Sequence, residues 1–336
     1  MRVMTMQLHF IKEVENEKNT CNHSGTGKRP EVSGRKGKEF QFCYRTKEEI
    51  TVSDVVDAEI ILGNIPVELV PKAKKLKFLQ LDSAGSTEYT ASGVLMPDTK
   101  LANATGAYGL AISEYMLAGV LMLRKKLHLY QKNMEQHLWK DEGEVLSIRD
   151  SVTLVVGLGD IGSQFAEKMH ALGSEVIGVR KHKAARPDYI KEVCQQEDLD
   201  RLLPKADIVA CCMPGTGETA GMFDLERMKK MKPGAILINV GRGSLIPGEA
   251  LKKMLVEGHL GGAILDVTEE EPLPADSPLW DLPNLLITPH VSGNYHMRQI
   301  LDTVVKIAGE NLEAFLDGKE LVNEVDLCTG YRKFKA

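Results

Sequence analysis

The fold is decided by the stretch SVTLVVGLGDIG, residues 151–162. Its three glycines, Gly157, Gly159 and Gly162, follow an apolar run and open a helix-like segment with the spacing G-x-G-x-x-G. The first glycine of this spacing permits a tight turn, the second a close backbone approach to a pyrophosphate, and the third tight packing of helix on strand. The helix that follows presents free N–H groups to phosphates at its N-terminus. The stretch therefore predicts a dinucleotide-binding loop.

The second half of the chain continues this alternation of strand and helix. Apolar segments of strand length recur there, with helical segments between most of them; they are Val152–Val156, Glu175–Val179, Ile208–Cys212, Ala235–Val240, Gly262–Asp266 and Leu285–Thr288. Such alternation predicts parallel strands joined by crossover helices, and six of them make a complete doubly wound sheet. The predicted fold class is α/β.

The first hundred residues indicate a second, smaller α/β region. Apolar runs at Ile60–Leu62 and Phe78–Leu81 flank a helix-like segment at Val67–Lys75, and residues 3–11 alternate weakly, as a first strand would. The polar stretch 15–38 predicts a loop or a poorly packed helix with no assignable role. Its GTGK does not fit a phosphate-binding P-loop, because Asn22 stands at the motif's first glycine and Arg29 follows the lysine.

Length and composition exclude several classes of protein. A chain of 336 residues is long enough for two domains. Its formal net charge is -5 and it has no basic stripe, so nucleic acid is not an expected partner. No apolar run approaches the roughly 18 residues of a membrane span. The six cysteines form no CxxC pair, which favours reduced thiols in a cytoplasm, and no His/Cys/Asp cluster has metal-site spacing.

One helical segment is apolar almost all round. It runs over Leu110–Leu123 and is interrupted mainly by Ser113 and Glu114. A helix of this kind is buried, but at 14 residues it is too short to cross a bilayer. It is expected inside the protein or against a second subunit. Because most soluble oligomers have two-fold symmetry, a homodimer is the prediction, and complete burial within one subunit is the alternative.

The end of the segment Glu175–Val179 bears on which dinucleotide binds. An NAD site usually has Asp or Glu there, about 20 residues after the glycine loop, where the carboxylate bonds the ribose 2′-hydroxyl. This chain has the basic cluster Arg180-Lys181-His182-Lys183 instead. These cations would attract a 2′-phosphate that a carboxylate would repel, so NADP is favoured over NAD. NAD bound through backbone contacts, beside a solvated basic loop, is the alternative.

Three later strands end in unusual polar residues. They are Arg242 in INVGRGSLI, Asp266 and Glu271 in GAILDVTEEEPLP, and His290 in LLITPHVSG. Ligands of open α/β sheets bind at the carboxyl ends of the strands. An arginine between two glycines suits a carboxylate. A histidine at a strand end can act as an acid or a base near neutral pH, and an acidic neighbour would orient it and favour its protonated form.

Four motifs together resemble those of the D-isomer-specific 2-hydroxyacid dehydrogenases. They are Gly157-x-Gly159-x-x-Gly162, Val240-Gly241-Arg242-Gly243, Asp266-Val267 with Glu271-Pro272-Leu273, and Pro289-His290-x-x-Gly293. The motifs occur in the family's order and spacing, and the resemblance covers roughly residues 55–325. The likeness is to the glyoxylate/hydroxypyruvate reductase branch.

The resemblance implies an architecture and a reaction. A Rossmann-type dinucleotide-binding domain, residues 103–290, would be inserted into a smaller flavodoxin-like substrate domain, residues 1–102 and 291–336. The reaction would be hydride transfer between a nicotinamide cofactor and a small 2-oxo acid or D-2-hydroxy acid. By this likeness His290 is the acid/base, Glu271 is its partner, and Arg242 clamps the substrate carboxylate and carbonyl.

The resemblance and the glycine loop together give the expected contacts. Substrate contacts are Arg242, His290 and the loop Ser83, Ala84 and Gly85, whose segment QLDSAG resembles the family's carboxylate-binding loop. Cofactor contacts are Gly157, Leu158, Gly159, Asp160, Ile161, Gly162, Arg180, Lys181, the turn Met213-Pro214, Val240, Arg242, Asp266 near the nicotinamide amide, His290 and Gly293. Thr268 stands where an aromatic residue is common, which leaves the identity of the acid open.

A second class of protein shares this resemblance. The C-terminal-binding-protein corepressors use the same fold to assemble transcription partners, so a dinucleotide-sensing scaffold is the alternative function. The chain has no obvious extended interaction tail. Turnover of simple 2-oxo acids separates the two hypotheses.

Overall fold

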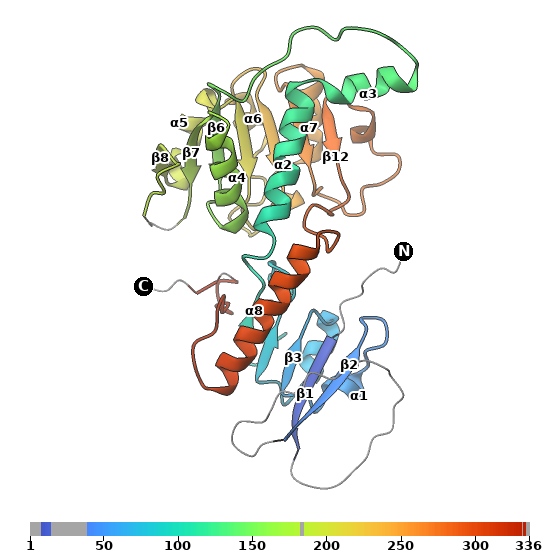
Figure 1. The fold of residues 1–336 in the computed structure, drawn as a ribbon, viewed down its shortest axis with the longest axis vertical. Helices are drawn as coiled ribbons and strands as arrows, with labels where there is room; N and C mark the ends of the chain where they lie inside the picture. The colour runs from blue at the N-terminus through green and yellow to red at the C-terminus, as the bar shows by residue number, and fades with distance from the viewer. Residues whose placement is uncertain (1–7, 15–38, 182–184, 331, 334–336) are drawn as a thin grey trace. The chain divides into compact units, whose positions relative to one another are not determined.

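A seven-stranded sheet organises the larger of two compact units, Tyr108–Ile300, in a computed structural model of the chain (Figure 1). In spatial order its strands are β12 (Leu285–Ile287), β11 (Gly262–Leu265), β10 (Ile236–Asn239), β9 (Ile208–Cys211), β6 (Val152–Val156), β7 (Glu175–Val179) and β8 (Glu192–Cys194). Every neighbouring pair is parallel. The structure describes residues 8–14, 39–181, 185–330 and 332–333.

This sheet confirms the predicted α/β fold class. All six expected strands are present, and the three-residue strand β8 was not expected because Glu192–Cys194 shows no apolar pattern. Four strands end at least one residue earlier than predicted. The residues left outside them, among them Asp266 and Thr288, therefore lie in loops at the carboxyl edge of the sheet.

Helices cover both faces of the sheet. The helices α2 (Gly109–Arg124) and α4 (Asp160–Ala171) lie side by side on one face (Figure 1). The other face packs in one apolar core with residues of α5, α6 and α7. The remaining elements of this unit are α3 (Leu127–Glu135), η2 (Gln196–Asp198), α5 (Leu199–Leu202), η3 (Leu203–Lys205), α6 (Leu225–Lys229), η4 (Gly243–Leu245), α7 (Gly248–Val256) and η5 (Pro278–Asp281).

The apolar helix α2 has one buried face and one partly exposed face. Met116 and Val120 are fully buried, and a Cβ at Gly119 would lie 2.8 Å from Ile264 of β11. Leu110 is exposed and Leu117 is partly exposed. Helix α2 therefore packs closely on the sheet while presenting leucines outward. No helix in the described part of the chain is long and apolar enough to cross a membrane.

The smaller unit, Met1–Ala107 with Leu301–Ala336, has a five-stranded sheet. Its order is β2 (Glu39–Arg45), β1 (Leu8–Val14), β3 (Ile60–Leu62), β4 (Phe78–Gln80) and β5 (Lys100–Ala102). Strands β3, β4 and β5 are parallel, whereas β1 runs antiparallel to β2 and β3. The other elements are α1 (Val52–Val55), the 3-10 helix η1 (Val67–Lys72) where a longer helix-like segment was expected, and α8 (Arg298–Leu316). The polar stretch 15–38, residues 3–7 of the expected first strand, and His182 and Lys183 of the basic cluster lie outside the described residues.

The glycines of the loop after β6 generate a test of the fold. A Cβ at Gly162 would lie 2.0 Å from the Gly157 carbonyl oxygen, so Gly162→Ala forces the backbone of α4 away from β6. We expect a loss of about 1–3 kcal/mol in the free energy of unfolding, measured by urea denaturation, because overpacking outweighs the gain in helix propensity.

Gly159→Ala is the matched control, since a Cβ at Gly159 would meet no atom within 4 Å and its φ of -83° suits any residue. Its stability should match that of the wild type. Equal stability of Gly162→Ala and wild type would contradict the packing.

Candidate active site

The functional residues predicted from sequence line one edge of the seven-stranded sheet. In spatial order the loops there carry His290 after β12, Asp266 after β11, Arg242 after β10, Met213 after β9, Gly157 after β6 and Arg180 after β7. From β12 to β7 there are five spacings between strands, about 24 Å in all. An edge of this length suits an extended ligand rather than a compact one.

The glycine loop has room for a ligand where the protein itself needs none. Gly157 has a φ of +104°, and a Cβ there would lie 2.8 Å from the Cys212 backbone, so the turn and the packing require this glycine. Gly162 is required by the contact of α4 with the loop. Nothing in the fold requires Gly159, whose missing Cβ leaves open space at the start of α4. Because the first N–H groups of a helix have no partner within it, this space fits a pyrophosphate.

Side chains of the same loop bind the protein rather than a ligand. Leu158 packs against β7, where a Cβ at Gly178 would lie 2.3 Å from it. The Asp160 carboxylate accepts from the Gly109 N–H at 2.8 Å and from Gln164 Nε2 at 2.8 Å, which ties α4 to α2. If Leu158 and Asp160 contact a dinucleotide, as the sequence predicts, they do so through backbone atoms, because their side chains contact the protein.

Arg180 and Lys181 lie where β7 ends, next to the glycine loop. The Arg180 Nε is buried and has no hydrogen-bond partner within the described part of the chain. Lys181 Nζ binds Glu218 Oε2 at 2.7 Å, and this pairing lowers the pKa of Glu218, so its carboxylate stays charged. Glu218 offsets part of the Lys181 charge, which leaves Arg180 as the stronger candidate for a phosphate.

Asn239 shapes the loop that carries Arg242. It is fully buried at the end of β10, its Nδ2 donates to the Arg242 carbonyl at 2.9 Å, and its Oδ1 accepts from the Gly241 N–H at 3.1 Å. Arg242 Nη1 donates to the Gly241 carbonyl at 2.8 Å. No carboxylate among the described residues pairs with Arg242. Its remaining N–H groups can therefore receive an external carboxylate.

Neighbouring loops touch this one through its glycines. A Cβ at Gly241 would lie 2.3 Å from the Met213 carbonyl, and one at Gly243 would lie 1.7 Å from the Thr268 carbonyl. The Arg242 loop is thus enclosed between the loops that follow β9 and β11.

Next to Met213, burial raises the pKa of the Cys212 thiol to about 12, so this cysteine is neutral and unreactive.

His290 and Glu271 form a pair beyond β12. His290 Nδ1 and Glu271 Oε2 are 2.9 Å apart, and the two side chains are 52% and 41% exposed. The other oxygen, Glu271 Oε1, accepts from the Thr268 N–H at 3.1 Å, which fixes the carboxylate. With Nδ1 engaged, Nε2 is the nitrogen that can exchange a proton with a ligand.

Asp266 is buried below His290 and holds its loop. It is 3% exposed, and its carboxylate accepts from the Thr288 hydroxyl at 2.6 Å, from the N–H groups of Val291 and Ser292 at 3.0 to 3.2 Å, and from the Ser292 hydroxyl. Its backbone carbonyl accepts from the His290 N–H at 2.8 Å. His290 has a φ of +52°, a conformation that costs free energy and persists only where neighbours hold it.

Within the smaller unit, two asparagines clamp the loop after β4. Asn64 Nδ2 donates to Ser83 Oγ at 3.0 Å, and Asn103 Nδ2 donates to the Ala84 carbonyl at 2.9 Å. Ser83 Oγ in turn donates to the Gly85 carbonyl at 2.7 Å. The expected substrate loop thus has a fixed backbone, as recognition by N–H groups requires.

The other expected contacts are placed as follows. Val240 is buried at the end of β10, Pro214 is exposed, and Gly293 packs against α2, where a Cβ would lie 3.0 Å from Ile112. Sequence reasoning missed Asn64, Asn103 and Asn239. The first two are short polar residues outside any motif, and Asn239 lies in the stretch INVGRGSLI but was given no role. In the described residues no group of three or more His, Cys, Asp or Glu side chains could hold a metal ion.

A doubly wound parallel sheet with a glycine loop at its carboxyl edge is a fold that binds dinucleotides there. Residues 117–292 match the family described as "D-isomer specific 2-hydroxyacid dehydrogenase, NAD binding domain". The chain belongs to this family. It is an oxidoreductase that uses a nicotinamide dinucleotide.

Relatives and solved structures agree with this assignment. Glyoxylate/hydroxypyruvate reductase B of Pectobacterium carotovorum is 39% identical over 175 residues, which are 51% of this chain and 53% of that protein. The crystal structure of a D-isomer specific 2-hydroxyacid dehydrogenase family protein from Aeromonas salmonicida is 35% identical in sequence and has a TM-score of 0.74. The match covers 82% of this chain and 87% of that one. The NADPH-dependent glyoxylate/hydroxypyruvate reductase of Sinorhizobium meliloti, solved with NADP and sulfate, is 27% identical with a TM-score of 0.71, covering 80% and 87%.

Proposed function

We propose that the protein reduces small 2-oxo acids to D-2-hydroxy acids with NADPH, and catalyses the reverse reaction with NADP. The observation that carries this proposal is the His290–Glu271 pair, 2.9 Å apart, at the sheet edge that also bears the glycine loop and Arg242. Glyoxylate and hydroxypyruvate are the first candidates, because the name of the Sinorhizobium reductase includes both.

Each residue has a distinct task in this reaction. When bound, the nicotinamide supplies or takes up the hydride. His290, protonated, donates from Nε2 to the carbonyl oxygen and accepts a proton in the reverse direction, while Glu271 keeps Nδ1 engaged. Arg242 binds the substrate carboxylate and carbonyl through the N–H groups that Gly241 does not occupy.

We assign the two parts of the chain to the two ligands. Residues 103–290 form the dinucleotide-binding domain, which also carries Arg242 and His290, and residues 1–102 with 291–336 form the substrate-binding domain. The clamped loop Ser83–Gly85 supports the second assignment, because its backbone N–H groups suit a carboxylate. The free thiols Cys211 and Cys212 are consistent with a cytoplasmic enzyme.

The cofactor is NADP in preference to NAD. Arg180 stands where a carboxylate would select NAD, and its Nε is a buried donor without a partner in the described chain. A 2′-phosphate would satisfy this guanidinium. The Sinorhizobium structure contains NADP, which is consistent with this choice.

The proton-transfer role of His290 is tested by His290→Ala. This substitution should lower kcat for 2-oxo acid reduction by about 10²- to 10⁴-fold, the usual contribution of an acid–base group, while the variant still binds NADPH. His170→Ala, an exposed histidine on α4, is the control and should retain wild-type kinetics. Wild-type kcat in His290→Ala would remove His290 from the mechanism.

The cofactor preference is tested by Arg180→Asp. We expect the wild type to favour NADPH, and the variant to lose about 10- to 150-fold in NADPH affinity as a charge-assisted bond becomes a repulsion. NADH should bind equally well or better, because Asp can accept from the 2′-hydroxyl.

The measurement is kcat/KM and dissociation constants for both cofactors at one ionic strength. Lys205→Asp makes the same charge change at an exposed residue of η3 and should change neither constant. A wild type that prefers NADH, or an unchanged ratio in Arg180→Asp, would rule out the assignment.

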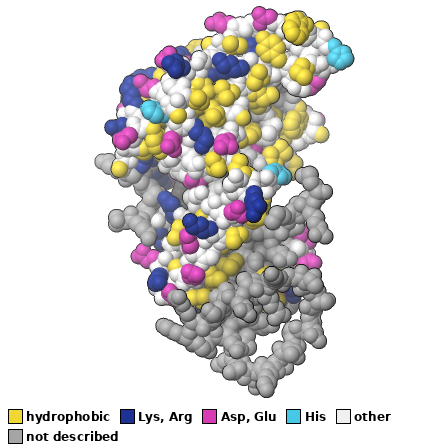
Figure 2. Space-filling view, viewed as in Figure 1, with side chains coloured by type: hydrophobic (Ala, Val, Ile, Leu, Met, Phe, Trp, Pro, Cys, Tyr) yellow, Lys and Arg dark blue, Asp and Glu magenta, His cyan; other side chains and the backbone are white. Residues whose placement is uncertain are grey.

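We also propose that the protein is a homodimer formed through α2 and the segment after it. Figure 2 shows hydrophobic side chains gathered over the part of the larger unit where α2 and α3 lie. Met134, Leu138 and Trp139 are exposed there, and Trp139 is as exposed as in an extended chain, at 106%. Such a patch on a soluble protein marks an association surface. This extends the sequence-based surface beyond α2 itself.

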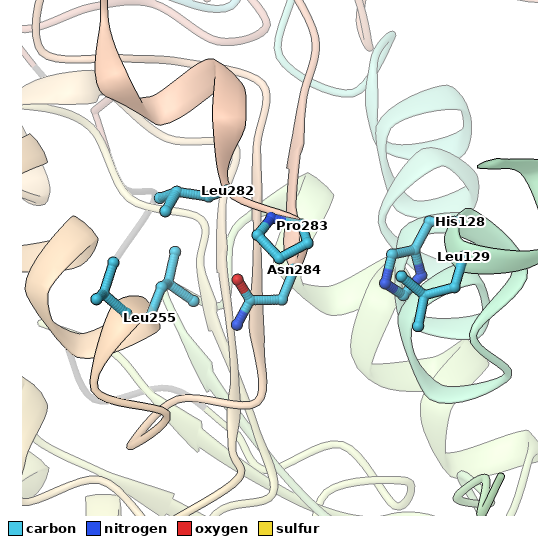
Figure 3. A pocket seen from close by; sticks show the side chains of 7 residues that line it. His128, Leu129, Leu255, Leu282, Pro283 and Asn284 are labelled. Carbon is cyan, nitrogen blue, oxygen red and sulfur yellow. The ribbon is translucent and has the colours of Figure 1, made fainter. Parts of the chain in front are cut away.

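A groove next to α3 belongs to the same surface. His128 and Leu129 line one side of it, and Leu255, Val256 and the turn 282–284 line the other (Figure 3). The turn directly precedes β12, so the groove lies at the opposite end of that strand from His290. An apolar groove there suits side chains of a second subunit rather than a substrate.

Light scattering at micromolar concentration tests the dimer. The wild type should have the mass of two chains, and a Met134→Asp/Trp139→Asp double variant should have the mass of one, because two buried carboxylates oppose association. Val305→Asp, which alters an exposed valine on α8, should leave the mass unchanged. A monomeric wild type would defeat the proposal.

A further inference from the structure

A chain of hydroxyl groups joins α2 to the loop that carries His290. Tyr115 Oη lies 2.6 Å from Thr288 Oγ1, and Thr288 Oγ1 lies 2.6 Å from Asp266 Oδ1. A carboxylate only accepts, so the single hydroxyl proton of Thr288 goes to Asp266. Tyr115 must therefore donate to Thr288. The direction of the whole chain is fixed: Tyr115 to Thr288 to Asp266.

The carboxylate at the end of this chain is saturated by its own protein. Its two oxygens accept from the Thr288 hydroxyl, from the N–H groups of Val291 and Ser292, and from the Ser292 hydroxyl. An ionised carboxylate has about four acceptor positions. Asp266 therefore acts chiefly on the loop 288–292, and it does so from a site that is 3% exposed.

This loop needs such support because His290 lies in the left-handed region at a φ of +52°. This conformation is unfavourable for a residue other than glycine, which keeps it only where its surroundings impose it. The Asp266 carbonyl accepts from the His290 N–H, and the Asp266 carboxylate holds the next two N–H groups. These bonds hold the backbone from which the imidazole reaches Glu271.

Tyr115 is suited to be a permanent donor. It is half-buried on α2, and burial is the largest of the causes that raise its pKa. The hydroxyl thus keeps its proton throughout the physiological range. At its N-terminus the same helix donates the Gly109 N–H to Asp160 of the glycine loop. Helix α2 therefore contacts both the dinucleotide loop and the histidine loop.

We propose that Tyr115 is a positioning residue for hydride transfer: through Thr288 and Asp266 it holds the loop 288–292, and so the His290 imidazole, in its reactive orientation. The inference rests on the proposed role of His290. It assigns Asp266 to the support of this loop, and it assigns α2 a part in catalysis besides subunit contact.

The main test is Tyr115→Phe, which removes one donor and keeps the ring. With NADPH and either glyoxylate or hydroxypyruvate, whichever the wild type reduces, kcat should fall about 3- to 10-fold, the effect of one hydrogen bond. The dissociation constant for NADPH and the KM for the acid should change less than about 2-fold. The solvent deuterium isotope effect on kcat should rise, because proton transfer from a displaced His290 becomes the slow step; a merely structural loss of active protein would leave it unchanged.

A second readout needs neither cofactor nor substrate. Hydrogen exchange in the segment 288–293 should be faster in Tyr115→Phe than in the wild type, because the bonds to Val291 and Ser292 open more often. Tyr130→Phe is the matched control. Tyr130 lies on α3, and its hydroxyl donates to Asp141 and accepts from the Glu142 N–H in the segment after that helix. The Tyr130→Phe variant should therefore leave kcat and the exchange of segment 288–293 unchanged.

The order of the hydrogen bonds from Tyr115 through Thr288 to Asp266 is tested with variants of Thr288. Thr288→Val should lower kcat at least as much as Tyr115→Phe does. Thr288→Ser keeps the hydroxyl and should therefore keep kcat near the wild-type value. If the groups act in series, the Tyr115→Phe/Thr288→Val double variant is no slower than Thr288→Val alone. Multiplied losses in the double variant, or wild-type kcat and exchange in Tyr115→Phe, would overturn the inference. If His290→Ala itself retains wild-type kcat, the proposed function fails first, and the exchange measurement alone decides the role of Tyr115.

Discussion

Parallel pairing is the constraint on which the rest of this structure depends. Because all seven strands of the larger sheet are parallel, their carboxyl ends lie at the same edge of the sheet. The loops after β6, β7, β9, β10, β11 and β12 therefore lie together although they are far apart in sequence. A ligand-binding edge is a consequence of the topology, and the loops have only to supply the right side chains.

Buried polar groups then fix the conformations of these loops. Asn239 and Asp266 are almost completely buried at the ends of β10 and β11, and a buried polar group without partners is costly. Each satisfies its hydrogen bonds on the backbone of the loop that follows: Asn239 on the Arg242 loop and Asp266 on the His290 loop. In the smaller unit Asn64 and Asn103 do the same for the loop of Ser83. The loops that carry the expected site residues are thus held by buried polar neighbours.

Periodicity and glycine spacing predict much of this fold, because strands buried on both faces leave continuous apolar runs. Six strands of the larger sheet and the glycine loop follow from the sequence alone. The strand β8 is too short to show a pattern, and the antiparallel pairing of β1 depends on partners that periodicity does not specify. Of the three expected glycines, only Gly159 is free of packing constraints. The spacing in the sequence does not distinguish it from the other two, because the constraints come from residues that pack against the loop in the fold.

The expected site is predictable where a motif marks it and hidden where distance in sequence separates the partners. Arg242, Glu271 and His290 stand in motifs, and the structure brings Glu271 and His290 into contact. The contact of Tyr115 with Thr288 joins residues 173 positions apart and leaves no local signal. The Asp266 carboxylate accepts from the loop 288–292 in the same way, and its expected position near the nicotinamide amide stays a prediction. Such networks depend on the whole fold.

We propose that this edge performs stereospecific hydride transfer rather than dinucleotide sensing. The most direct measurement incubates the purified protein with NADPH and each of glyoxylate, hydroxypyruvate, pyruvate, phenylpyruvate and a branched 2-oxo acid. NADPH oxidation is followed, and the chirality of the products that have a stereocentre is determined. The account predicts catalytic turnover of at least one acid, with the D-2-hydroxy acid as the only enantiomer where the product is chiral. Binding of NADPH without turnover of any acid, or formation of an L-product, would contradict it.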